Sequence, residues 1–181
     1  MKTNSKHFAA ISVMGKDRPG IVASITRVLF KAGCNIEDSS MTRLRSEFAM
    51  IVLADLPPRL DSAALQKLFV PLQEKEGLSI LVRGITATEE KRGKSAWKSH
   101  MLSVYGADRP GIVYRISRIL AARRVNITDV QTNKRGSAYV MLLEIELPKK
   151  LPLKSLNATL QKEARALHVN IGIRPVESPQ L

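Results

Sequence analysis

The sequence predicts an α+β protein built from two tandem copies of one βαββαβ unit. Shifting the chain by about 91 residues superposes its two halves without a gap, which is the signature of an internal repeat. Within each half, the spacing of apolar residues changes from alternating to helical and back in the same order. The 181 residues, of which 44% are apolar, suffice for two small folded domains.

The repeat is clearest in a short polar segment rich in glycine. The sequence Asp-Arg-Pro-Gly-Ile-Val occurs at residues 17–22 and again at 108–113. Further on, Asn35-Ile36 corresponds to Asn126-Ile127, and weaker matches continue toward the end of each half. Two copies of one domain are the simplest explanation.

The boundaries of the two domains follow from this alignment. We expect the first domain at residues 1–87, a linker at 88–98 and the second domain at 99–181. The linker is charged and has no apolar period, which is typical of an exposed connection. We expect Trp97, its one aromatic residue, to cover an apolar edge of the second domain rather than to bind a ligand.

Each element of the first half has its own pattern. Alternation over residues 7–14 predicts a half-buried strand. Pro19 fits the first position of a helix, apolar residues then recur with helical spacing, and Gly33 supplies a stop. Residues 35–43 and 47–55 predict a hairpin.

A second helix and a last strand complete the first half. The helix is expected over residues 61–76, with an apolar face made of Leu65, Leu68, Phe69 and Leu72. Pro71 should interrupt or kink it, because proline lacks the amide hydrogen that the helix needs. Residues 78–82 alternate again and predict a strand.

The second half repeats this order with one notable replacement. Its expected strands and helices lie at residues 98–105, 112–120, 126–134, 137–146, 153–167 and 169–173. Arg124 stands where the first half has Gly33, so we expect the turn before Asn126 to differ, since a positive φ would be strained there.

The order βαββαβ predicts a ferredoxin-like arrangement, in which an antiparallel sheet carries both helices on one face. The other face and the edges of such a sheet need cover. Two units in one chain can cover each other by pairing as a pseudo-symmetric dimer.

The repeated segment is the candidate binding site because it joins a strand to a helix. Free amide groups and the positive end of the helix attract a carboxylate there. Its glycines allow close approach by a small ligand, namely Gly15, Gly20, Gly106 and Gly111. Asp17 and Asp108 could cap the helix or accept a hydrogen bond from an ammonium group. These groups suit a zwitterion, although the same residues also make a good helix start with no ligand.

The repeated Asp-Arg-Pro-Gly-Ile-Val, followed about 15 residues later by Asn-Ile, resembles the signature of the ACT domain. The resemblance covers nearly the whole chain. Two units with no catalytic domain resemble the glycine cleavage system transcriptional repressor group. This resemblance implies amino-acid binding between the units, with glycine as the signal and a transcription regulator as the protein partner.

The resemblance also implies the binding residues. The loop of one unit would face the second strand of the other, so that residues 15–22 work with Asn126 and residues 106–113 work with Asn35. The implied residues are Gly15, Lys16, Asp17, Arg18, Pro19, Gly20, Ile21, Val22, Asn35, Ile36, Gly106, Asp108, Arg109, Pro110, Gly111, Ile112, Val113, Asn126 and Ile127. Tyr114 and Arg115 replace Ala23 and Ser24, so the two sites need not be equivalent.

The net charge of +13 lies mostly in the second half, with about +2 before residue 91 and about +11 from there on. The basic residues there are not interleaved with aromatic side chains that could stack on bases, so direct nucleic-acid binding is the less favoured interpretation. An acidic protein surface is the alternative partner. A scaffold that acts without any ligand is a third possibility.

Enzymatic, metal-dependent and membrane functions lack their sequence signatures. The chain has no nucleophile elbow, Walker loop or dinucleotide-binding motif, so we expect neither an enzyme nor a cofactor. His7, His100 and His168 are isolated, and we expect them to be solvated or to lie at a strand edge rather than to bind metal. Cys34 has no second cysteine to pair with. No stretch is apolar enough for a signal or a membrane span, so we expect a cytoplasmic protein. Further copies of this chain are an alternative partner, as a homo-oligomer.

Overall fold

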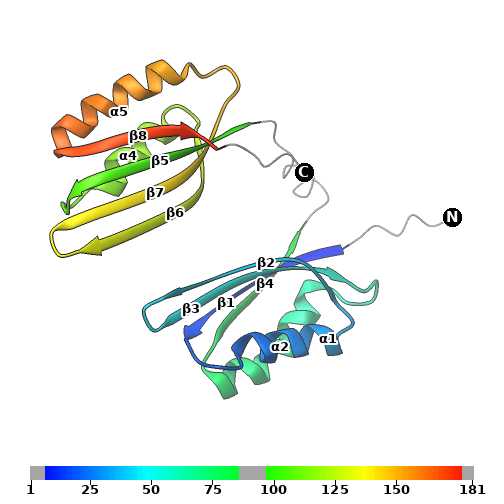
Figure 1. Cartoon of the computed structure of the whole chain (residues 1–181). Helices are drawn as coiled ribbons and strands as arrows, with labels where there is room; N and C mark the ends of the chain where they lie inside the picture. The colour runs from blue at the N-terminus through cyan, green and yellow to red at the C-terminus, as the bar shows by residue number, and fades with distance from the viewer. Residues whose placement is uncertain (1–6, 86–96, 177–181) are drawn as a thin grey trace. The chain divides into compact units, whose positions relative to one another are not determined.

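The computed structural model describes residues 7–85 and 97–176. The chain divides into two compact units, Met1–Lys94 and Ser95–Leu181, and each is described here by itself (Figure 1). Most of the expected linker lies outside the described residues. Its last residue, Lys98, already belongs to a strand, and Trp97 keeps 40% of its surface exposed.

The first unit has the expected order βαββαβ. Its elements are β1 (His7–Lys16), α1 (Ile21–Lys31), β2 (Asn35–Leu44), β3 (Glu47–Leu56), α2 (Ser62–Glu76) and β4 (Ser79–Ile85). The strands form one sheet in the order β2-β3-β1-β4, with every neighbouring pair antiparallel. Both helices lie on the same face of this sheet, as Figure 1 shows.

The second unit repeats this architecture. Its elements are β5 (Lys98–Ala107), α4 (Ile112–Ala121), β6 (Asn126–Arg135), β7 (Ala138–Leu147), α5 (Leu153–Leu167) and β8 (Val169–Pro175). The sheet order is β6-β7-β5-β8, again antiparallel throughout. Two ferredoxin-like units are therefore confirmed, and even the irregularity in strand pairing recurs, after Ile36 and after Ile127.

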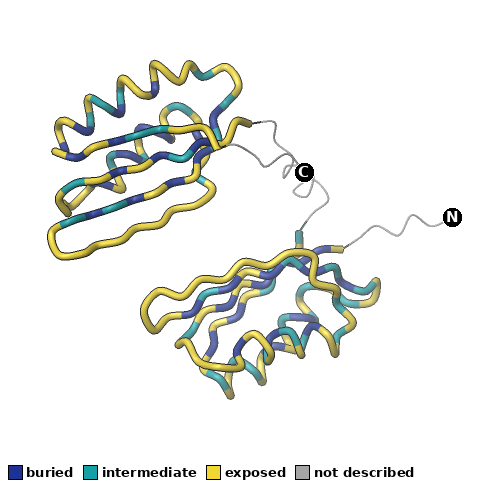
Figure 2. Tube along the Cα trace, viewed as in Figure 1, coloured by how far each residue is buried: buried dark blue, intermediate teal, exposed yellow. Residues whose placement is uncertain are grey.

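Each unit has its own core between its sheet and its helices. In the first unit, alternate residues of β1 and β3 point toward the helices and are buried, for example Val13 and Met50, which pair across the two strands. The buried positions alternate with exposed ones along the inner strands in both units (Figure 2). The edge strand β2 is exposed along its whole length.

Helix α2 corrects two expectations. It continues through Pro71 from Ser62 to Glu76, so the predicted interruption is wrong. Leu65 and Phe69 are fully buried as expected, but Leu68 is 48% exposed. Asp61 caps this helix by accepting a hydrogen bond from the amide of Ala64.

The turn after the first helix is the same in both units, which corrects another expectation. Gly33 has φ 73° and Arg124, its counterpart, has φ 56°. Arg124 thus adopts the left-handed conformation that an L-residue normally avoids. The fold imposes this turn whether or not a glycine is present.

His100 and Cys34 are titratable side chains that the fold removes from solvent at least in part. His100 is buried, and its Nδ1 lies 3.1 Å from the carbonyl oxygen of Lys98, so the expectation of a solvated side chain is wrong for this histidine. Cys34 is half-buried, and burial, together with the charge of Asp55, raises the pKa of its thiol.

Among residues 7–85 and 97–176, no helix is both long and apolar enough to cross a membrane.

Candidate ligand-binding site

The loop between β1 and α1 is fixed to the β2–β3 turn by its aspartate. The amide of Asp17 donates to the carbonyl oxygen of Ser46 over 2.7 Å, and the carboxylate of Asp17 lies 3.5 Å from the guanidinium of Arg43. The carboxylate makes no hydrogen bond to the start of α1. The expected capping role of Asp17 is therefore wrong, and its carboxylate faces Arg43 instead.

The second unit makes the same two contacts. The amide of Asp108 donates to the carbonyl oxygen of Ser137 over 3.0 Å, and Lys134 Nζ lies 2.5 Å from the Asp108 carboxylate. Helix α4 likewise has no side-chain cap. Since both copies of the repeat hold this aspartate by a cation on the facing strand, its position is a property of the fold.

Helix α1 begins later than the sequence suggests. Its first residue is Ile21, and its N-cap is Gly20, in the left-handed conformation at φ 94°. Pro19 therefore lies outside the helix, contrary to the expectation that it occupies the first helical position. Gly111 takes the same role before Ile112, at φ 91°. A Cβ on either glycine would meet nothing within 4 Å, so the space above each helix start is open.

The other two glycines of the motif serve packing. A Cβ on Gly15 would lie 2.7 Å from Leu78 Cδ2, and one on Gly106 would lie 2.8 Å from Val169 Cγ1. The space above these glycines is thus filled by the residue just before β4 in the first unit and by the first residue of β8 in the second. This corrects the expectation that a ligand approaches there. Their small size lets the sheet close beside the loop.

An open pocket of about 520 Å³ lies beside this loop in the first unit. It is bounded by the loop, the first turns of α1 and the facing residues of β2 and β3. The lining residues are Asp17, Arg18, Gly20, Ile21, Val22, Ala23, Thr26, Met41 and Phe48. Five of the nine were expected from the sequence, and the loop motif therefore does border a pocket.

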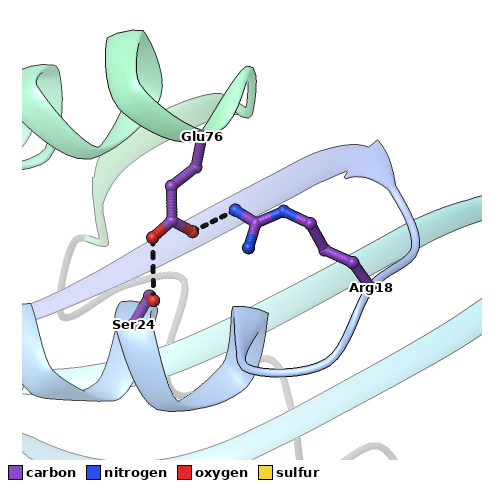
Figure 3. Close-up of polar contacts among 3 residues, drawn as sticks. All are labelled: Arg18, Ser24 and Glu76. Atoms are coloured by element: carbon purple, nitrogen blue, oxygen red, sulfur yellow. Dashed lines mark hydrogen bonds and ion pairs between the residues drawn. The ribbon is translucent and has the colours of Figure 1, made fainter.

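The guanidinium of Arg18 is held by the end of α2. Arg18 Nη2 donates to Glu76 Oε2 over 2.5 Å, and Ser24 Oγ donates to Glu76 Oε1 over 2.9 Å (Figure 3). Burial alone would raise the pKa of Glu76, but the hydrogen bonds from Ser24 and Arg18 and the charge of Arg18 outweigh it, so the pKa lies below its ordinary value. Glu76 is thus ionised and fixed.

Other expected residues lie away from the pocket. Asn35 pairs with Asp55, at the end of the sheet opposite to the loop, and its Nδ2 donates to Glu37 Oε1 over 3.2 Å. Asn126 donates to Glu146 Oε2 over 3.2 Å. Neither asparagine can reach the loop of its own unit, and the expected role against the other unit stays a prediction. The expected residues Lys16, Pro19 and Ile36 are exposed and do not line this pocket.

The second unit carries larger side chains at equivalent positions. Tyr114, which is 65% exposed, replaces Ala23, and Tyr139 replaces Phe48. Burial raises the pKa of Tyr139, and the charge of Asp108 adds to this effect. Arg115 replaces Ser24 and forms an ion pair with Glu163. Of the expected residues, Arg109, Pro110 and Val113 are exposed, whereas Ile112 is buried and Ile127 packs against the core.

The sequence contained signals for some of the missed residues. Arg43 and Lys134 are both basic and occupy equivalent positions in the two repeats, as do the aspartates that they contact. The hairpin register places Met41 opposite Met50, on the helix side of the sheet. Glu76 had no such signal, since the second repeat has a leucine at its position.

Metal binding finds no support in the part of the chain that the structure describes. No group of three or more histidine, cysteine, aspartate or glutamate side chains there could hold a metal ion. The polar groups at the loop are instead suited to binding a small charged molecule by hydrogen bonds and ion pairs.

Comparisons with known proteins agree with this description. The family model of the ACT domain matches residues 7–83 and 100–174. The glycine cleavage system transcriptional repressor of Escherichia coli (strain K12) is 29% identical over 171 residues, which cover 92% of this chain and 87% of that protein. The alignment thus extends over nearly the whole length of both proteins.

Two solved structures show the same fold over nearly the whole chain. One is described as an unknown protein from Galdieria sulphuraria, with a TM-score of 0.80 and 26% identity, covering 95% of this chain and 99% of that one. The other, described as a candidate glycine cleavage system transcriptional repressor, has a TM-score of 0.71 and 17% identity, covering 96% and 99%. With two matches to one family model that together span most of its length, the chain belongs to the ACT domain family and carries two copies of the domain.

Proposed function

We propose that this chain is a non-enzymatic regulator that binds a small amino acid beside the β1–α1 loop and thereby changes its affinity for a partner protein. The ACT domains and the similarity to a transcriptional repressor support a regulatory role. The name of the Escherichia coli relative makes glycine the first ligand to test and a transcription regulator the first partner.

The pocket of the first unit carries this proposal, because it offers a partner for each part of a zwitterion. Helix α1 has no side-chain cap, so the amides of Ile21, Val22 and Ala23 are available to an α-carboxylate, which the positive end of the helix also attracts. The Asp17 carboxylate, which lines the pocket, can accept hydrogen bonds from an ammonium group. Met41 and Phe48 supply apolar contacts for what remains of the ligand.

Regulation requires that the ligand bind two states of the protein with different affinities. The loop is a suitable place for such a difference, because three parts of the unit meet there. Asp17 links it to the β2–β3 turn, and Arg18 links it to the end of α2. A ligand that reorients either side chain would therefore alter contacts with elements outside the pocket.

Calorimetric titration of the full chain with the common amino acids, starting with glycine and serine, tests this function. The pocket-filling variant Ala23→Tyr introduces the side chain that the second unit carries at this position, so the fold should accommodate it. The matched control is Tyr114→Ala, which makes the reverse change in the second unit. We expect saturable binding that Ala23→Tyr abolishes and that Tyr114→Ala leaves intact.

Other outcomes would point elsewhere. Binding that survives Ala23→Tyr would place the ligand outside this pocket. If no amino acid gives a heat of binding and none raises the melting temperature, a regulator that acts without a ligand would be favoured.

A further inference from the structure

The pocket of the first unit contains two charged side chains, and both are already paired. Asp17 contacts Arg43, and Arg18 contacts Glu76. The other lining residues are a glycine, apolar side chains and Thr26, whose Oγ1 donates to the carbonyl oxygen of Val22 over 2.9 Å. A ligand side chain would therefore meet a surface on which the charges of the described residues are balanced.

Glu76 is the fixed member of its ion pair. Its side chain is 13% exposed, against 40% for Arg18, and Ser24 holds its second carboxylate oxygen. Glu76 ends α2, and Leu78, two residues later, lies close against Gly15. One carboxylate oxygen of Glu76 is held by Ser24 and the other by Arg18, as Figure 3 shows.

We propose that Glu76 determines the ligand specificity of this pocket by holding the Arg18 guanidinium. With Arg18 neutralised, the pocket takes zwitterionic amino acids with small uncharged side chains and rejects dicarboxylic amino acids, whose second carboxylate would find no free cation. This inference rests on the proposed function, since it concerns the same pocket. Glu76 acts through Arg18 and is a positioning residue.

The second unit lacks this arrangement. Leu167 occupies the position of Glu76, and Arg109, the counterpart of Arg18, has no hydrogen-bond or ion-pair partner within residues 97–176. Glu163 instead forms an ion pair with Arg115 between the two helices. Glu163→Gln is therefore a matched control, because it removes a carboxylate from a helix-to-helix ion pair that does not involve the loop arginine.

The test compares the affinities of the full chain for serine and for aspartate by calorimetric titration. Glu76→Gln keeps the size of the side chain and releases Arg18. We expect the preference for serine over aspartate to fall by about two- to fivefold, which is the upper part of the range for one partly exposed ion pair. The control Glu163→Gln should leave the preference unchanged. A double variant, Arg18→Gln with Glu76→Gln, should restore the preference because the released cation is gone.

If Glu76 had a purely structural role, Glu76→Gln would lower the affinities for serine and aspartate equally. Such an unchanged preference would overturn the inference while leaving the proposed function in place. If neither the wild-type chain nor any variant binds an amino acid, both the proposed function and this inference fail. If Glu76→Gln unfolds the first unit, Arg18→Gln alone decides the matter. That variant leaves the Glu76 carboxylate without the Arg18 cation, so it should increase the preference for serine over aspartate. An unchanged or smaller preference would contradict the inference.

Discussion

Arg124 has the left-handed backbone conformation that Gly33 has at the equivalent position of the first repeat, with φ 56° against 73°. In both units, the residue ends the first helix and turns the chain into the second strand. The amide of the next residue, Val125 or Cys34, donates back to a carbonyl of the helix, Leu120 or Leu29, over 3.0 Å. The second unit thus keeps this turn at the cost of an unfavourable φ.

Replacing Arg124 by glycine should therefore stabilise the second unit by up to about 1 kcal/mol, because glycine accepts a positive φ without steric strain. Urea unfolding followed by Trp97 fluorescence measures this change, since Trp97 adjoins β5. The converse variant Gly33→Ala should destabilise the first unit. A lower stability for Arg124→Gly would show that the arginine side chain contributes more than its backbone costs.

Gly15 and Gly106 both lie against the chain where the last strand of their unit begins, but their surroundings differ. A Cβ on Gly15 would meet the movable end of Leu78 at 2.7 Å, whereas one on Gly106 would also meet Val169 Cα at 3.0 Å and the carbonyl oxygen of His168 at 3.1 Å. Side chains adjust more easily than backbone does. We expect Gly15→Ala to cost about 1 kcal/mol and Gly106→Ala up to about 3 kcal/mol in unfolding free energy. Equal effects in chemical denaturation would contradict this explanation.

The fold could be predicted from the sequence because the residues that face the core are apolar, and their spacing along the chain differs between a helix and a strand. The stripe that begins at Ile21 and Ile25 is buried against the sheet, and its counterpart in the second repeat is buried likewise. Because the two halves carry the same pattern, each element could be predicted independently from two segments. Errors arose where local sequence fits two geometries, as at Pro19, which suits a helix start but here precedes a left-handed Gly20.

The site was only partly predictable, for a different physical reason. The loop motif is local, so five lining residues could be read from it. Glu76 lies 58 residues from Arg18 in sequence, and the second repeat does not preserve it. Met41 and Phe48 reach the pocket through the hairpin register, which the apolar pattern alone does not relate to the loop.

Glu76 should make the stability of the first unit depend on acid. Its pKa in the folded chain is lower than its ordinary value of 4.5, so the folded state favours its ionised form. The stabilisation is fully present above the unfolded pKa and is lost as the pH falls through the folded pKa. Amide hydrogen exchange of the buried β1 residues, measured between about pH 6 and about pH 3, reports this loss after correction for intrinsic exchange.

The variants Glu76→Gln and Ser24→Ala separate this contribution from those of other carboxylates. Glu76→Gln should flatten the acid dependence of the first unit, and Ser24→Ala should reduce it by less, because one of the two hydrogen bonds remains. An acid dependence that is the same in all three proteins would assign it to other groups.

Asp17 should matter more for ligand affinity than for folding. Its ion pair with Arg43 is long and exposed, so Asp17→Asn should change the unfolding free energy by less than about 1 kcal/mol. The variant removes the carboxylate that would hold the ammonium group of an amino acid, and we expect affinity to fall by about tenfold or more, as for the loss of a charge-assisted hydrogen bond. Asp108→Asn makes the same change in the second unit, where Lys134 is the partner. If the first unit holds the ligand, Asp108→Asn should leave the calorimetric affinity unchanged, whereas a loss confined to Asp108→Asn would move the functional site to the second unit.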